Sequence, residues 1–150
     1  MKKILAVFLL TTFGLSTHAY AQDEVTINKL ATNQNTKKAL EKIVADQHLP
    51  KWITQAGTVS PTQKVKIKGN QYLVMTSCKP HDCNSQKVAF IYEPTTKKIA
   101  GVFSSMNEKD GSEKLKWLSV PDNLSIDGKT ILFAALTGSL DNHPNDFNFK

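Results

Sequence analysis

One feature constrains the fold of this 150-residue chain more than any other: it contains five short apolar segments. The links between these segments are too short to hold a crossover helix. The segments are residues 65–67, 72–75, 87–92, 99–103 and 115–118. Turn-forming residues such as Gly69 and Pro94 separate them. Strands joined by such short links pair antiparallel, because parallel neighbours need a connection of a dozen or more residues. The pattern predicts an antiparallel sheet of about five strands.

Helical patterns stand before and after the predicted sheet. Leu40, Ile43 and Val44 have the i, i+3, i+4 spacing of one apolar helix face. Residues 131–136 form a second apolar stretch, whose alanine and leucine content favours a helix that ends at Gly138. Helices that flank an antiparallel sheet along the chain can cover its faces, so the sequence predicts an α+β domain.

The first 21 residues have the order of a secretory signal peptide. Two lysines precede an apolar run at residues 4–10, and the segment closes with the small residues Ala19 and Ala21. The run is shorter than the ~20 apolar residues that a membrane-spanning helix needs. We expect residues 1–21 to be a cleaved signal peptide and residues 22–150 to be one exported domain, with no insertion into a membrane.

Composition and charge narrow the class of protein further. Hydrophobic residues make up 40% of the chain and charged residues 21%, which is the balance of an ordinary folded domain. Every basic side chain is a lysine, and the lysines are spread along the chain without an arginine fork for phosphates or bases, so we expect no nucleic-acid partner. After removal of residues 1–21, 17 lysines face 13 carboxylates, a net charge of +4.

The link between the second and third predicted strands is chemically unusual. It reads Cys78-Lys79-Pro80-His81-Asp82-Cys83. Two cysteines in an exported chain predict one disulfide. A bridge around so short a ring stabilises a protein by only ~2 kcal/mol in the chain-entropy account. Pre-organisation of the four enclosed residues is therefore the better reason for the bridge.

Several chemistries of this loop compete. A redox site would have Cys-x-x-Cys spacing, which the loop lacks. A zinc site would have only Cys78, His81 and Cys83, and oxidation would remove two of these ligands. A hydrolase would have His81 and Asp82 but no nucleophile beside them. Two interpretations remain: a stapled surface turn without a role, or a rigid loop whose Lys79, His81 and Asp82 enter a polar cleft of another protein.

The sequence closely resembles the Ivy family, the periplasmic inhibitors of vertebrate-type lysozyme made by Gram-negative bacteria. The likeness covers essentially the whole chain after residue 21. Its main features are Leu49-Pro50-x-Trp52, the 78–83 loop, and the C-terminal run from Leu124 through Gly138 to Asn142-His143-Pro144. The resemblance implies a three-layer α/β/α sandwich around an antiparallel sheet, an inhibitor rather than an enzyme, and no cofactor or metal.

The resemblance also implies a role for each residue of the loop. The loop would enter the active-site cleft of a C-type lysozyme, where His81 would reach the two catalytic carboxylates. Lys79 and Asp82 would flank His81, Pro80 would shape the loop, and the two cysteines would fix it. A periplasmic binding or chaperone module that uses the same loop on another envelope protein is the alternative.

The sequence leaves the biological partner and the assembly open. The target is either a host lysozyme or one of the cell's own muramidases, and both a monomer and a homodimer are compatible with the family. Vertebrate lysozymes are basic, so a mature chain of charge +4 predicts no long-range electrostatic attraction. We therefore expect the affinity to come from local fit.

Overall fold

The computed structural model describes residues 24–55 and 57–150, so the predicted signal peptide at residues 1–21 lies outside the described residues. Within them, six strands form one antiparallel sheet in the order β1-β3-β4-β5-β6, and β2 pairs with β3 beside β1. The strands are β1 Thr58–Val59, β2 Gln63–Ile67, β3 Asn70–Cys78, β4 Gln86–Glu93, β5 Lys98–Met106 and β6 Glu113–Leu118. The predicted sheet is confirmed, and the additional strand, β1, is too short to leave a pattern in the sequence.

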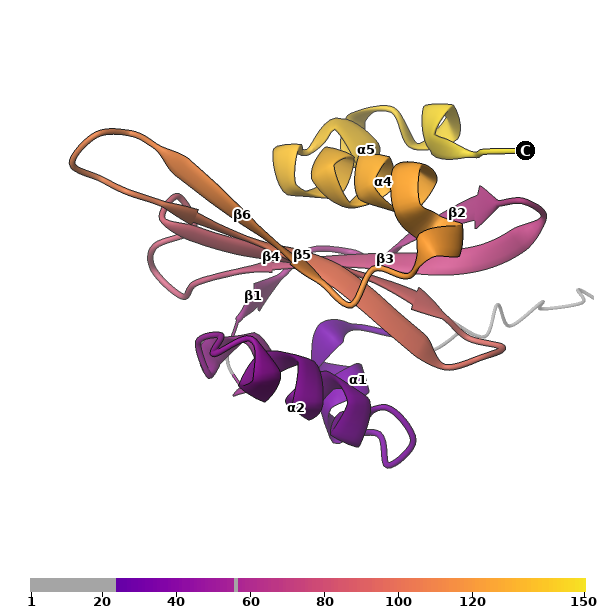
Figure 1. The fold of residues 1–150 in the computed structure, drawn as a ribbon, viewed down its shortest axis with the longest axis horizontal. Helices are drawn as coiled ribbons and strands as arrows, with labels where there is room; N and C mark the ends of the chain where they lie inside the picture. The colour runs from indigo at the N-terminus through magenta and orange to yellow at the C-terminus, as the bar shows by residue number, and fades with distance from the viewer. Residues whose placement is uncertain (1–23, 56) are drawn as a thin grey trace, which may run out of the picture.

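Helices lie against both faces of this sheet (Figure 1). The helices α1 and α2 lie on one side, and α4 and α5 lie on the other. The helical elements are α1 Ile27–Thr32, α2 Lys37–Asp46, α3 Trp52–Gln55, α4 Ser125–Thr137 and α5 Ser139–Asn142, with 3-10 turns η1 Asp122–Leu124 and η2 Pro144–Phe147. The predicted α+β class is confirmed. No helix in the described part of the chain is both long and apolar enough to cross a bilayer.

The core has two parts because the sheet is covered on both sides. Met75 and Phe90 belong to the cluster under α1, α2 and α3, whereas Val74 and Ile91 belong to the cluster under α4 and α5. All four side chains are at most 1% exposed. Since neighbouring residues of a strand point to opposite faces, burial on both faces makes these central strands continuous apolar runs instead of alternating ones.

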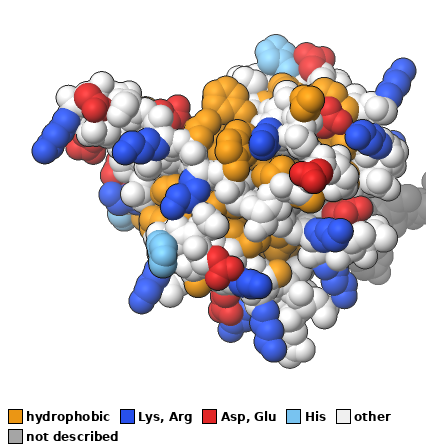
Figure 2. Space-filling view, viewed as in Figure 1, with side chains coloured by type: hydrophobic (Ala, Val, Ile, Leu, Met, Phe, Trp, Pro, Cys, Tyr) orange, Lys and Arg blue, Asp and Glu red, His pale blue; other side chains and the backbone are white. Residues whose placement is uncertain are grey.

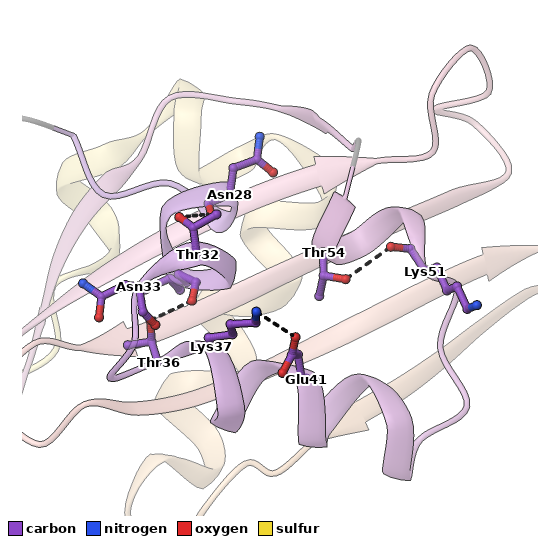
Figure 3. A network of polar contacts seen from close by, with 9 residues as sticks. Asn28, Thr32, Asn33, Thr36, Lys37, Glu41, Lys51 and Thr54 are labelled. Carbon is purple, nitrogen blue, oxygen red and sulfur yellow. Dashed lines mark hydrogen bonds and ion pairs between the residues drawn. The ribbon is translucent and has the colours of Figure 1, made fainter.

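Polar contacts hold the turn between α1 and α2 (Figure 3). The buried hydroxyl of Thr36 donates to the carbonyl of Leu30 at 2.7 Å and lies 3.5 Å from that of Asn33. The ion pair between Lys37 and Glu41 spans 3.9 Å and is about half exposed, so it adds little to stability. The Thr36 hydroxyl therefore holds this turn together with the backbone N–H groups of Thr36 and Lys37, which donate to the carbonyl of Asn33.

The last long helix, α4, is longer than predicted and leaves one side exposed. It begins at Ser125, earlier than the predicted residue 131, and it ends as predicted at Gly138, which has a φ of 81°. Ile126 is 79% exposed and Phe133 is 45% exposed, so the helix is not buried on all sides. The reason is that α4 lies on the surface of the sheet, which leaves its outer side to solvent.

Candidate functional site

The 78–83 loop lies where β3 turns into β4, at one end of the sheet. Cys78 is the last residue of β3 and pairs with Lys87 of β4. A disulfide joins Cys78 to Cys83, as predicted, and their Cα atoms are 4.8 Å apart. With the two sulfurs bonded to each other, neither is free as a thiolate ligand or as a redox thiol. The bridge closes a small ring at the tip of the β3–β4 hairpin.

Inside the ring the backbone makes a tight turn that presents His81. The carbonyl of Lys79 accepts a hydrogen bond from the backbone N–H of Asp82 at 3.0 Å. Pro80 occupies the second position of this turn, and His81, at the third, has a φ of 62°. Proline followed by a positive φ is typical of a type II turn. The left-handed backbone costs a non-glycine residue roughly 1–2 kcal/mol, and the turn places His81 in an exposed position.

The charged neighbours of His81 bond to each other. Lys79 Nζ donates to Asp82 Oδ2 at 2.8 Å, and the Ser85 hydroxyl donates to the same oxygen at 2.5 Å. The Asp82 carboxylate is therefore engaged within the loop and does not orient the imidazole. Among the described residues, no hydrogen bond or ion pair of the His81 side chain is found. The charged groups of Lys79 and Asp82 thus pair within the loop, and the imidazole of His81 is left to contact a partner.

The hydrogen bonds from Lys79 and Ser85 hold the pKa of Asp82 below its ordinary value. Because the folded-state pKa is lowered, the stabilisation is present above the ordinary pKa of an aspartate and is lost as the pH falls through the lowered one. We expect the loop to keep this network at neutral and mildly acidic pH. An NMR titration of the Asp82 carboxyl should show an inflection below that of an exposed aspartate.

The Ser85→Ala variant tests the cause of this shift, because it removes one hydrogen bond without changing the charge. The inflection of Asp82 should then move up toward the ordinary value. An inflection that stays where it is in the wild-type protein would mean that the Ser85 contact does not exist in solution.

Three contacts outside the ring support the loop. The backbone N–H of Lys79 donates to the carbonyl of Gln86 at 3.0 Å, and Trp52 Nε1 donates to Gln86 Oε1 at 2.9 Å. The backbone N–H of Met106 in β5 donates to the carbonyl of Ser85 at 2.8 Å. These contacts fix the loop to α3 and to the β5–β6 hairpin.

Sequence reasoning did not identify Ser85, Gln86 or Met106 as part of the site. The short spacing between Asp82 and Ser85 is a local signal that could have found one of them, since a serine in a turn commonly bonds to a nearby backbone group, as the Ser85 hydroxyl does to the carbonyl of Asp82 at 3.3 Å. The bond between Trp52 and Gln86 joins residues 34 positions apart, and no local pattern predicts it.

The remaining charged side chains do not form a second candidate site. The lysines in Figure 2 are scattered among carboxylates and do not gather in one patch. In residues 24–55 and 57–150, no group of three or more histidine, cysteine or acidic side chains is placed to hold a metal ion. The 78–83 loop therefore remains the candidate site.

Comparisons with known proteins found relatives of this chain. The family model described as "Inhibitor of vertebrate lysozyme (Ivy)" matches residues 35–136, a range that includes the whole β3–β4 hairpin. A protein of Escherichia coli named "Inhibitor of vertebrate lysozyme" is 48% identical over 145 residues, which are 97% of this chain and 92% of that protein.

Two more distant relatives extend the comparison. A protein of Pseudomonas aeruginosa with the same name is 36% identical over 44 residues, 29% of this chain and 29% of that protein. An uncharacterised protein of Yersinia pestis is 30% identical over 118 residues, 73% of this chain and 72% of that protein. The similarity to the Escherichia coli protein thus extends over almost the whole of both chains, beyond the hairpin alone.

Proposed function

Because the chain belongs to the Ivy family of inhibitors of vertebrate lysozyme, we propose that it inhibits a C-type lysozyme by placing the 78–83 loop in the active-site cleft. The observation that carries this proposal is the exposed, unbonded imidazole of His81 on a loop that is otherwise held by internal bonds. Since the loop is ordered before it binds, little conformational entropy is lost on association. The contacts of the imidazole then contribute to affinity without a large entropic cost of ordering the loop.

The chemistry of the target suits an imidazole. A retaining glycosidase uses one protonated carboxyl as its acid and one ionised carboxylate as its nucleophile, about 5–5.5 Å apart. A neutral imidazole has one donor and one acceptor nitrogen, and a charged one has two donors. The His81 ring between the two carboxyls would hydrogen-bond to both and occupy the place of the sugar. No covalent bond is made or broken, so the chain acts as an inhibitor and not as an enzyme.

The other loop residues have supporting roles in this proposal. The Lys79–Asp82 ion pair braces the turn, and its side chains, 43% and 33% exposed, are accessible to the rim of the cleft. Pro80 sets the turn that presents His81, and the disulfide between Cys78 and Cys83 limits the motion of the ring. Together these residues define the shape that enters the cleft.

The proposed place of action is the periplasm. Residues 1–21 would direct export and be removed, and residues 22–150 would form the mature inhibitor. There it would protect the cell wall against a host lysozyme or restrain one of the cell's own muramidases. Both targets cut the same polymer, so the proposal covers the reaction that is blocked and leaves the source of the enzyme to experiment.

Titration of the purified protein in a lytic assay tests the proposal. Protein taken from the periplasm should begin at Gln22 by mass spectrometry, and it should inhibit a vertebrate C-type lysozyme at near-equimolar concentration. A panel of muramidases, including those of the producing cell, then separates the possible targets. A micromolar excess that leaves C-type lysozyme fully active would remove this function and favour a binding or chaperone role for the loop.

A further inference from the structure

The 78–83 loop is too small to be the whole contact with an enzyme. A stable interface between two proteins buries about 800 Å² and about 20–30 residues on each side. Six residues supply a minor part of this. If the loop enters the cleft as proposed above, the enzyme surface around the cleft must rest on residues next to the loop.

The turn between β5 and β6, residues 106–113, is one such surface, and we name it the hairpin tip. The backbone hydrogen bond from Met106 to Ser85 attaches it directly to the segment that follows the loop. Figure 1 shows the hairpin projecting beyond the helices at the end of the sheet where β3 turns into β4. A partner protein that surrounds the loop on this side would therefore contact the hairpin tip.

The hairpin tip is ordered by its own hydrogen bonds. The backbone N–H of Asn107 donates to the carbonyl of Ser112 at 2.8 Å, and that of Gly111 donates to the carbonyl of Asn107 at 2.8 Å. Asp110 accepts from the Ser112 backbone N–H at 2.9 Å and from the Asn107 side chain at 3.0 Å. The tip, like the loop, has its shape before a partner arrives, which lowers the entropic cost of binding.

A hollow of about 310 Å³ lies between the loop and the tip. Its walls include Asp82, Asn84 and Ser85 on one side and Met106, Asn107 and Glu108 on the other. The Asp82 carboxylate is already paired with Lys79, whereas Glu108 is an exposed carboxylate at the edge of the hollow. Met106 is 41% exposed, so it presents a large apolar side chain to solvent. The hollow thus combines an acidic edge with an apolar wall.

The loop and the hairpin tip are themselves more acidic than the chain as a whole. Residues 78–85 and 106–113 carry four carboxylates and two lysines, whereas residues 22–150 carry more lysines than carboxylates. Figure 2 shows acidic side chains on the projecting hairpin, with lysines among them. A basic enzyme is therefore repelled less by these two segments than by the chain as a whole, so local charge favours docking here.

We propose that the hairpin tip is a second contact arm, and that the hollow receives a lysine or arginine side chain from the rim of the lysozyme cleft. Glu108 pairs with the cationic group, and Met106 packs against its alkyl stem. The inference rests on the proposed function, because it assumes that the loop occupies the cleft. It adds a recognition residue, Glu108, that lies outside the loop and outside the disulfide ring.

Two substitutions of Glu108 test the contact arm against a matched control. Glu108→Gln should raise the inhibition constant for a vertebrate C-type lysozyme by about 3-fold, and Glu108→Lys by about tenfold or more, mainly through slower association. Asp122→Lys makes the same change of charge at an exposed position beyond the other end of β6 and should leave the inhibition constant unchanged. Thermal unfolding of each variant should match that of the wild-type protein.

The outcomes separate this inference from the proposed function. If the wild-type protein fails to inhibit, the proposed function fails and the arm with it. If the wild-type and Asp122→Lys proteins inhibit, and Glu108→Lys inhibits equally well, the loop binds without the tip and only the contact arm is wrong. Equal losses in the Glu108→Lys and Asp122→Lys variants would point to net charge and would also overturn the arm.

Discussion

Replacement of His81 by alanine should weaken the inhibition of C-type lysozyme by roughly 30-fold to several thousandfold, a loss of about 2–5 kcal/mol of binding free energy. The reason is that the imidazole is the group on the loop that is proposed to meet both catalytic carboxyls, and its removal leaves them without their partner. The measurement is an inhibition constant from titration at fixed pH and ionic strength. The melting temperature should change little, because the His81 side chain is exposed.

The backbone at His81 calls for a second variant. Its φ of 62° lies in the left-handed region, which alanine adopts less readily than asparagine. His81→Asn keeps the turn and removes the imidazole, so it should lose as much affinity as His81→Ala. His48→Asn is the matched control, since His48 is also exposed and has a φ of 51°. A His81→Asn protein that inhibits like the wild type would show that the imidazole is not the main contact.

Loss of the disulfide should weaken binding more than it weakens folding. In the double variant Cys78→Ser with Cys83→Ser, we expect the free energy of unfolding to fall by about 2 kcal/mol, since the closed ring is short. The enclosed side chains become free to move, and ordering each of them again on binding costs about 0.5–1.5 kcal/mol. For the four residues together we expect a loss of roughly 3 kcal/mol of binding, or more than a hundredfold.

Urea unfolding and inhibition titrations on the same samples compare the two losses. The wild-type protein in reducing agent provides a second route to the open ring, because there are no other cysteines in the described chain. A larger loss in folding than in binding would make the bridge a structural staple. Adding His81→Asn to the open ring should cost less than in the bridged protein, because both changes act on the same loop and are not additive.

Much of the site was predictable because its signals are local. The spacing of Cys78 and Cys83, with Pro80 between them, predicts a bridged and stiff loop from six consecutive residues. Gly138 ends the last long helix as expected, because a residue with a positive φ is needed there. In the same way, short turns between apolar segments predict antiparallel pairing before any contact between the strands is known.

The extent of elements was harder to predict where local preference is weak. The two residues of β1 become a strand only because they lie beside Ser77 and Cys78 at the edge of β3. The first turns of α4 contain Gly128, a poor helix former, and they are helical because Leu124 and Ile131 pack into the core on either side. The bounds of these two elements depend on neighbours that are distant in the sequence, so the local sequence pattern does not predict them.

The sequence by itself determined the class of fold, the disulfide ring and the residue at its tip, since turn chemistry, short apolar segments and cysteine spacing act over a few positions. Only the tertiary structure decided that Lys79 and Asp82 pair with each other, that Trp52 holds the start of β4, and that the hairpin tip stands beside the loop. The physical reason is that side-chain direction and strand register determine these contacts, and both follow from packing the whole chain.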